Sequence, residues 1–336
     1  MSFGVLLTVK VLAVLGLMLG GAVVVIFAEL KIGAHMQNRV GPYFAGGRYG
    51  WAQPIADALK FMQKEDLVPD GADVRVYKMA PYIVLMGTIG VFVVLPISPR
   101  FVARDLDLGA FYALAISSLT TLGVLMAGWS SNNKYSLIGG LRAAAQLIAY
   151  ELPLVLAVVA VVIQAETVSI SGIIEAQANP AFSVGGLDVV LPYVLSGQIV
   201  GFAIFMVASL AELNRIPFDL PIAESELTMG FVTEYSSMRF AMFFLAEYAG
   251  ILSMSALATA FYLGGYYVPG LPLSTIEVLG PVIFISKVLV LAFVMIWLRW
   301  TLPRLREDQL QILAWKWMIP AALANIVITA TFKVVF

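Results

Sequence analysis

Four ionisable side chains associated with long apolar runs are the first candidates for chemistry in this sequence. Glu151, Glu247 and Lys287 lie within such runs, and Glu29 ends the first one. An ionisable group at membrane depth costs at least about 2.5 kcal/mol, so each is a functional candidate by default. Arg239 lies two helical turns before Glu247 on the same helix face. Lys287 has two open interpretations, a functional group and a structural lysine that snorkels or forms an ion pair.

A loop at residues 212–238 is rich in acids. The acids are Glu212, Asp219, Glu224, Glu226 and Glu234, and the neighbouring bases are only Arg215 and Arg239. Clustered carboxylates in a low-dielectric site cannot all ionise, so some of them should hold protons near neutral pH. A new negative charge beside such a cluster would draw protons toward it, which is what a proton relay needs. The alternative is a solvated acidic loop with no role in proton transfer.

A polar stripe enters the apolar run that contains Glu151. Arg142, Gln146 and Tyr150 recur at helical spacing, and Glu151 is adjacent to them. Pro153 follows and is able to open the helix backbone. A polar stripe in lipid must face other helices or water, so we expect it to point into the protein.

Spanning helices are needed to position these residues. The chain has 336 residues, of which 61% are hydrophobic and 12% charged, against roughly 25% charged in soluble domains, which excludes a soluble enzyme. A hydrocarbon core about 30 Å thick needs about 20 apolar residues per helix. Eight stretches qualify, and they run over residues 5–28, 79–97, 108–128, 142–164, 189–211, 239–264, 278–298 and 312–332. We therefore expect one all-helical membrane domain over residues 1–336.

Lys and Arg residues set the orientation. They concentrate in alternate loops, whereas the loops at 165–188 and 265–277 contain neither. The positive-inside rule then predicts eight spans with both termini outside. The first apolar run lacks a preceding basic cluster and a small-residue cleavage site, so we expect a retained membrane helix.

The segment 33–78 is expected to be a cytoplasmic loop with an amphipathic helix at residues 51–65. Its apolar face carries Trp51, Ile55, Leu59 and Met62, and its polar face carries Gln53, Asp57, Lys60 and Lys64. Such a helix lies along the membrane surface. Taken alone, the pattern is also compatible with a simple interfacial anchor.

Composition excludes several other functions. The net charge of −1 offers no basic surface for a run of phosphates, so we expect no nucleic-acid partner. The chain has no Cys and a single His, His35, so we expect no metal site and no iron-sulfur cluster in it. Any redox centre must therefore belong to a partner.

Two long blocks carry a family resemblance. Residues 127–152, which include Trp129, Asn132-Asn133-Lys134-Tyr135 and the polar stripe, closely resemble the signature of the H-subunit family of respiratory complex I, the NADH:quinone oxidoreductase. A second block, residues 211–248, is similar to the same family. Shorter matches lie at residues 37–42, 53–57, 64–66, 297–304 and 308–310.

The resemblance implies a polytopic membrane protein at the joint between the peripheral and membrane arms of a bacterial enzyme in the plasma (inner) membrane. The first and sixth spans and the amphipathic helix would frame the entrance for a lipid-soluble quinone, ubiquinone or menaquinone. FMN and iron-sulfur clusters would lie only in partner subunits. The implied partners are the hydrophilic quinone-site and terminal iron-sulfur subunits, small and antiporter-like membrane subunits, and lipid. No activity is expected of the chain alone.

The resemblance also assigns roles to residues. The proton relay would use Glu151, Glu212, Asp219, Glu224, Glu226, Glu234 and Glu247. The quinone entrance would use Glu29, Arg39, Gln53, Asp57, Lys60 and Arg239. Two positions depart from the common family pattern, because Ile222 replaces a further Glu and Leu30 replaces an Arg.

Two alternatives stay open at this point. The chain is also compatible with the homologous component of a membrane-bound hydrogenase or of a ferredoxin- or F420-dependent dehydrogenase, because the electron donor binds to other subunits. The second alternative is an autonomous ion transporter, against which stand the long charged loops and the lack of an internal repeat.

Overall fold

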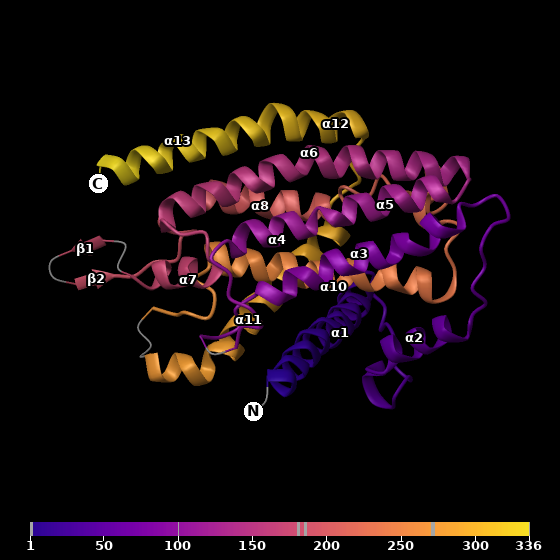
Figure 1. The fold of residues 1–336 in the computed structure, drawn as a ribbon, viewed down its shortest axis with the longest axis horizontal. Coiled ribbons are helices and arrows are strands. Elements are labelled where there is room, and N and C mark those ends of the chain that lie inside the picture. Colours follow the sequence, from indigo (N-terminus) through magenta and orange to yellow (C-terminus); the bar gives the residue numbers. More distant parts are fainter. Residues whose placement is uncertain (1–2, 100, 180–181, 185–186, 270–272, 336) are drawn as a thin grey trace.

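Long apolar runs in this chain form helices, because a helix satisfies its own backbone hydrogen bonds where no water can. The computed structural model describes residues 3–99, 101–179, 182–184, 187–269 and 273–335 (Figure 1). The first half of the chain forms α1 (Phe3–Met36), η1 (Arg48–Gly50), α2 (Gln53–Gln63), α3 (Val74–Val94), α4 (Gly109–Ser117), α5 (Leu119–Ser130), α6 (Lys134–Ala165) and α7 (Ile170–Ala178). The second half forms α8 (Ile199–Glu212), α9 (Glu224–Leu227), η2 (Gly230–Val232), α10 (Ser237–Tyr262), α11 (Leu273–Thr301), α12 (Glu307–Ile312), the π-helix η3 (Leu313–Met318) and α13 (Ile319–Val335).

The helices confirm an all-helical polytopic membrane fold. Within the described residues, seven helices are long and apolar enough to span a membrane, and α8 is a shorter apolar helix of 14 residues. The strand content is a two-stranded antiparallel hairpin of β1 (Phe182–Val184) and β2 (Leu187–Val189), in which Phe182 pairs with Val189.

The predicted fifth span, residues 189–211, begins too early. The helix starts only at Ile199, and an apolar loop precedes it. Pro192 lacks a backbone donor and Gly197 has a φ of +110°, so the backbone there does not continue a helix. The Val194 amide instead donates to the carbonyl of Tyr262 at the end of α10, 3.0 Å away. Composition alone cannot distinguish such an apolar loop from a helix.

Two other spans also differ from expectation. The third span is broken into α4 and α5 at Ser118. On the neighbouring helix α3, a Cβ at Gly87 would lie 3.0 Å from the carbonyl of Ile116, so a glycine lets α3 approach close to this break. The fourth span, α6, begins at Lys134, eight residues before the predicted start, because the Asn133 side chain caps the helix at the Tyr135 amide.

The core surrounds α10, which contacts α1, α3, α8 and α11. Leu257, Ala258 and Phe261 of α10 have no exposed surface. The α13 helix lies along α6 on the outside of the bundle, and α1 lies on the side of α10 that faces away from α6 (Figure 1).

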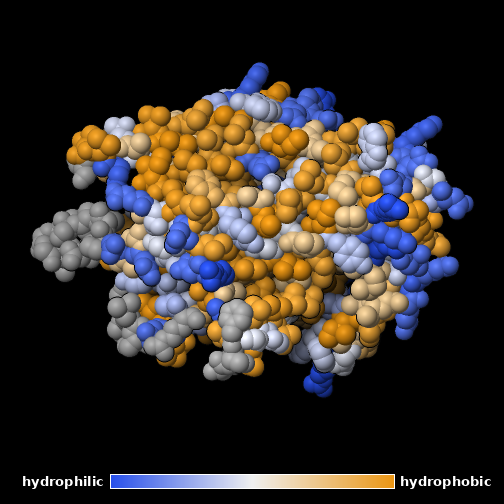
Figure 2. Space-filling model, in the orientation of Figure 1, coloured by the Kyte–Doolittle hydropathy of each residue, from blue (hydrophilic) through white to orange (hydrophobic). Residues whose placement is uncertain are grey.

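The two ends of the bundle differ. The C-terminus lies at the end that carries α7 and the β-hairpin, the N-terminus lies below the middle of the bundle in this view, and α2 lies at the opposite end with the long loops (Figure 1). Figure 2 shows an apolar band across the middle of this face and hydrophilic residues gathered at the α2 end. All six tryptophans are exposed, namely Trp51, Trp129, Trp297, Trp300, Trp315 and Trp317. Exposed tryptophans at span ends are typical of a membrane interface.

The α2 helix lies within residues 51–65, where the amphipathic pattern was found. The residues of the predicted apolar face, of which Trp51 precedes the helix, are exposed. Trp51 is 58% exposed, Leu59 53% and Met62 63%. This face is therefore available to lipid or to a partner.

Candidate functional site

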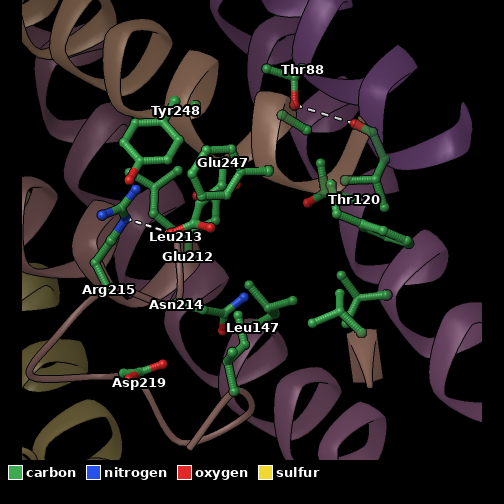
Figure 3. Close-up of a pocket in the computed structure, with 18 of the residues that line it drawn as sticks. Thr88, Thr120, Leu147, Glu212, Leu213, Asn214, Arg215, Asp219, Glu247 and Tyr248 are labelled. Carbon is green, nitrogen blue, oxygen red and sulfur yellow. Dashed lines mark hydrogen bonds and ion pairs between the residues drawn. The ribbon is translucent and has the colours of Figure 1, made fainter. Parts of the chain in front are cut away.

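A cavity of about 480 Å³ lies between α3, α5, α8, α10 and the loop that follows α8. Its charged lining consists of the acids Glu212, Asp219 and Glu247 and the bases Arg215, Arg299 and Arg304. Figure 3 shows Arg215 and Tyr248 on one side of it and Thr88 and Thr120 on the other. The rest of the lining is largely aliphatic and aromatic. Apolar walls strengthen the interactions between the charges, because they lower the local dielectric.

Arg215 connects two helices through a buried ion cluster. Its Nη1 donates to Glu29 Oε1 at 3.0 Å and to Glu29 Oε2 at 2.8 Å. Its Nε lies 2.6 Å from Glu247 Oε1, and its guanidinium carbon lies 4.5 Å from the centre of the Tyr248 ring. Arg299 of α11 forms a second ion pair with Glu29. One guanidinium thus holds α1 against α10.

The charge state of Arg215 follows from its neighbours. Burial lowers the pKa of Arg215, but the negative charge of Glu247 and other acidic neighbours raises it more, so the net shift is upward. The guanidinium therefore stays charged. The Tyr248 side chain lies against it (Figure 3), so the positive charge is enclosed by acids and by an aromatic ring.

Two other acids complete the cavity. Asp219 Oδ2 pairs with Arg304 Nη2 at 2.9 Å, which ties the loop after α8 to the segment after α11. Glu212 ends α8, and Ser117 at the end of α4 lines the same cavity. The cavity therefore brings acids from α8, α10 and the loop into one space.

Glu151 lies next to the cavity and not in its lining. Leu147, one helical turn earlier on α6, lines the cavity. Glu151 itself is half-buried, at the border between the buried and exposed faces of α6. It therefore lies one helical turn from the cavity wall, on a partly exposed face of α6.

The predicted polar stripe on α6 is confirmed, and it holds the acidic loop. Gln146 Nε2 donates to Ala211 O, Asn214 Oδ1 and Phe218 O at 2.7, 3.0 and 2.8 Å. The Tyr150 hydroxyl donates to Leu310 O at 3.0 Å. The α6 helix continues through Pro153, so the proline does not open it.

The acidic loop is dispersed, contrary to the expectation of one cluster. Glu226 pairs with Arg142 at 2.7 Å on the surface. Glu234 accepts a hydrogen bond from Asn133 Nδ2 at 2.5 Å in a surface cleft. The side chain of Glu224 lies outside the described part of the structure. Only Glu212 and Asp219 of the described loop acids line the cavity.

The residues predicted for the entrance lie in separate places. Glu29 belongs to the ion cluster. On α2, Asp57 accepts from Gln53 Nε2 at 3.0 Å and pairs with Lys60 at 2.6 Å. Arg39 is exposed, and its Nε donates to the side chain of a neighbouring glutamine.

Arg239 and Glu247 share a helix face, but they do not pair. Arg239 Nη2 lies 2.9 Å from Asp66 Oδ2, in the linker that follows α2, and Glu247 pairs with Arg215. The two side chains are two helical turns apart, and each has a nearer partner on another segment.

Lys287 fits the structural interpretation. Its Nζ donates to the carbonyls of Leu263, Gly265 and Tyr267 at 2.7, 2.9 and 2.8 Å. An ammonium has three donors, so all of them are used. The residue holds the end of α10 against α11.

Arg299, Arg304 and the hydroxyls of the cavity were not predicted as functional residues. Buried acids require counter-charges. The apolar sequence around Glu29 and Glu247 therefore indicated that basic residues must face them. The sequence carries no signal for which basic residues these are. Ile222, which stands where the common family pattern has a further Glu, lines the same cavity with an apolar side chain.

The chain is similar to known proteins along almost its whole length. The profile of the NADH dehydrogenase family matches residues 9–330. The H subunit of the NADH-quinone oxidoreductase of Geobacillus kaustophilus is 45% identical over 311 residues, 93% of this chain and 89% of the relative. The H subunit of the Geobacillus thermodenitrificans enzyme is 45% identical, over 95% of this chain and 91% of the relative. Its Bacillus mycoides counterpart is 44% identical, over 96% and 92%.

Proposed function

The chain belongs to the NADH dehydrogenase family, as a homologue of the H subunit of NADH-quinone oxidoreductases, and on this premise we propose that it is the quinone-site membrane component of a proton-translocating NADH:quinone oxidoreductase. In this role it frames the entrance for the quinone. It also relays the charge produced by quinone reduction toward the pumping subunits.

The ion cluster in the cavity is the observation that carries this proposal. Arg215 contacts Glu29 and Glu247 at once, so a change of charge at one acid changes the balance at the other. Two unit charges about 4 Å apart interact by roughly 4 kcal/mol at an effective dielectric of about 20. That interaction is large enough to move a proton.

This geometry supports the following relay. When quinone reduction places negative charge beside Glu29, the Arg215 guanidinium is drawn toward it and its contact with Glu247 weakens. Glu247 then lacks its counter-charge and takes up a proton. Glu212, in the same cavity, carries the change toward Glu151 on the outer side of α6. Glu226 and Glu234 act from the surface, where their partners Arg142 and Asn133 hold them.

The entrance is supported by the contacts among α1, α2 and α10. Each of these helices contacts the other two. The apolar side chains of α2 are exposed, and Glu29 and Arg215 lie where α1 meets α10. A lipid-soluble quinone, ubiquinone or menaquinone, would enter from the membrane beside α2. The polar groups proposed for the entrance lie on α2, on α10 and in the linker after α1, and they are Gln53, Asp57, Lys60, Arg239 and Arg39.

Partners and location belong to the same proposal. The chain has no Cys, so hydrophilic subunits would carry the iron-sulfur clusters and FMN. Glu151 is half-exposed at membrane depth, where a carboxylate must face protein or water, so small and antiporter-like membrane subunits would cover it. The complex would lie in the bacterial plasma membrane with both termini of this chain outside.

The test is purification in mild detergent through a tag on this chain, with mass spectrometry of the co-purifying proteins and an assay of NADH-driven quinone reduction. Co-purification of iron-sulfur and antiporter-like subunits with that activity would support the proposal. A complex that assembles but does not oxidise NADH would overturn the choice of electron donor. A chain that purifies alone and transports ions would overturn the whole proposal.

A further inference from the structure

Three backbone carbonyls converge on one ammonium group at the end of α10. Lys287 Nζ, on α11, lies 2.7, 2.9 and 2.8 Å from the carbonyl oxygens of Leu263, Gly265 and Tyr267. We call these three oxygens the carbonyl cage. Because Leu263 is the C-cap of α10, the positive charge also lies at the negative end of a 26-residue helix. The turn after α10 therefore offers a cation three oxygen atoms and a favourable helix dipole.

The charge of Lys287 is balanced by these oxygens and not by an acid. Lys287 is half-buried and, among the described residues, its polar contacts are the three carbonyls of the cage. A charge that leaves water needs either a counter-charge or a set of ligands. In cation channels, rings of backbone carbonyls replace the hydration shell of the ion in the same way. The carbonyl cage is thus a ligand set for a cation.

Contacts that do not involve Lys287 hold the cage in shape. The Gly264 amide donates to Gln177 Oε1 at 2.9 Å, and the Gly265 amide donates to the carbonyl of Thr259 at 2.9 Å. Gly264 and Gly265 have φ angles of +72° and +55°, in the left-handed region that glycine adopts without strain. The turn is therefore preformed, and we expect the three oxygens to keep their positions without the ammonium group.

The size of the carbonyl cage indicates which cations fit. Its oxygens lie between 2.7 and 2.9 Å from Nζ. Mg²⁺ binds oxygens at about 2.0–2.1 Å and Ca²⁺ at about 2.3–2.6 Å, and both ions commonly take carboxylate ligands. The cage has longer distances and consists of uncharged oxygens. It therefore suits a large monovalent cation, such as ammonium or K⁺.

Space for a free cation lies next to the cage. A cavity of about 270 Å³ borders Lys287, Leu263, Gly264 and Tyr267. A water molecule takes up about 30 Å³ in the liquid, so this cavity has room for a cation with several waters. Removal of the Lys287 side chain beyond Cβ would extend the cavity to the three oxygens.

We propose that the turn after α10 is a binding site for one large monovalent cation, ammonium or K⁺, and that Lys287 fills this site with its own side chain. The covalent tether makes occupancy of the site independent of the ions around the protein. A free cation enters only when the lysine side chain is shortened. The inference does not rest on the proposed function, because neither Lys287 nor the carbonyl cage takes part in the relay.

The test compares Lys287→Ala with Lys287→Met in the complex purified through a tag on this chain. The alanine variant vacates the carbonyl cage, whereas the unbranched methionine side chain fills it with apolar atoms. In equilibrium dialysis with radioactive Rb⁺, a substitute for K⁺, the alanine variant should bind one more ion per chain than the wild type or the methionine variant. Equal binding in all three proteins would overturn the inference.

Thermal stability gives a second measurement. In choline chloride, the alanine variant should melt below the wild type. Replacement of choline by K⁺ or ammonium at the same ionic strength should raise its melting temperature by about 2–4 °C, the effect of a cation at roughly tenfold its dissociation constant. The wild type and Lys287→Met should not respond. A rise of the same size in Lys287→Met would show a general salt effect and overturn the inference.

A third measurement applies if Lys287→Ala does not survive purification. Membranes that contain the variant would be solubilised in K⁺ buffer or in choline buffer, and the intact complex would be measured on native gels. Recovery of the complex in K⁺ alone supports the cation site. Loss of the complex in both buffers would overturn it, because a bound cation should replace the missing ammonium group.

Discussion

Arg215 Nε lies 2.6 Å from Glu247 Oε1, and this pair ties the loop after α8 to α10, close to the place where α10 contacts α1. The same guanidinium donates to both oxygens of Glu29. A buried ion pair of this kind stabilises little against an apolar core, but breaking it leaves an uncompensated charge. Arg215 therefore sets both the stability of the site and its response to charge.

Arg215→Lys should lower quinone reduction strongly, even though it keeps the charge. A single ammonium cannot reproduce the planar fork that contacts Glu29 and Glu247 together. We expect a loss of roughly tenfold in rate, about 1.4 kcal/mol, in complexes that retain all subunits. The measurement is NADH-driven quinone reduction normalised to assembled complex. A wild-type rate would show that the double contact is not needed.

Glu212→Gln and Glu247→Gln should each reduce proton pumping while the complex assembles. Both changes keep the shape of the side chain and remove its titratable proton, and both residues line the cavity. The measurement is the pH change in proteoliposomes per electron transferred. Glu166→Gln is the matched control, because Glu166 is exposed and pairs with Lys333 at 3.2 Å outside the cavity. Equal pumping in all three variants would remove the cavity acids from the relay.

Gly33→Ala should disturb the contact between α1 and α11. A Cβ at Gly33 would lie 2.5 Å from Trp300 Cζ2, one helical turn after Glu29 and next to Arg299. Overpacking of this kind costs about 1–3 kcal/mol, which should appear as a lower melting temperature and slower quinone reduction. Gly20→Ala on the same helix is the control, because nothing in the described part of the chain lies within 4 Å of its added Cβ.

A second substitution decides the cause of the Gly33→Ala effect. Trp300→Ala removes the ring that the new methyl group meets, so the double variant should recover part of the lost stability. No recovery would mean that the contact with Trp300 is not the reason for the loss.

Lys287→Met should destabilise the complex without changing the ratio of protons to electrons. The substitution leaves three carbonyls without their shared donor, and one unsatisfied buried group costs about 1–3 kcal/mol. The measurement is the thermal stability of the purified complex together with its pumping ratio. Ser286→Ala is the control, because its hydroxyl is exposed and donates within its own helix. A changed ratio at normal stability would return Lys287 to the functional candidates.

The sequence by itself determined the helical membrane fold and the buried candidates for chemistry. Most apolar runs of about 20 residues form spanning helices, because lipid offers the backbone no other hydrogen-bond partners. The polar stripe of Arg142, Gln146 and Tyr150 was likewise predictable, because helical spacing is local and lipid repels polar groups. The start of α8 was not, since an apolar loop with a satisfied backbone has the same composition as a span.

Only the tertiary structure decided which charges meet. Helical spacing put Arg239 and Glu247 on one face of α10. In the folded chain, however, Arg239 pairs with Asp66 and Glu247 pairs with Arg215, and both partners come from other segments. The acids of one loop separated for the same reason, since Arg142 and Asn133 hold Glu226 and Glu234 at the surface while Glu212 and Asp219 line the cavity. An ion pair forms with the nearest opposite charge in space, and that distance depends on how the helices pack, which no local pattern contains.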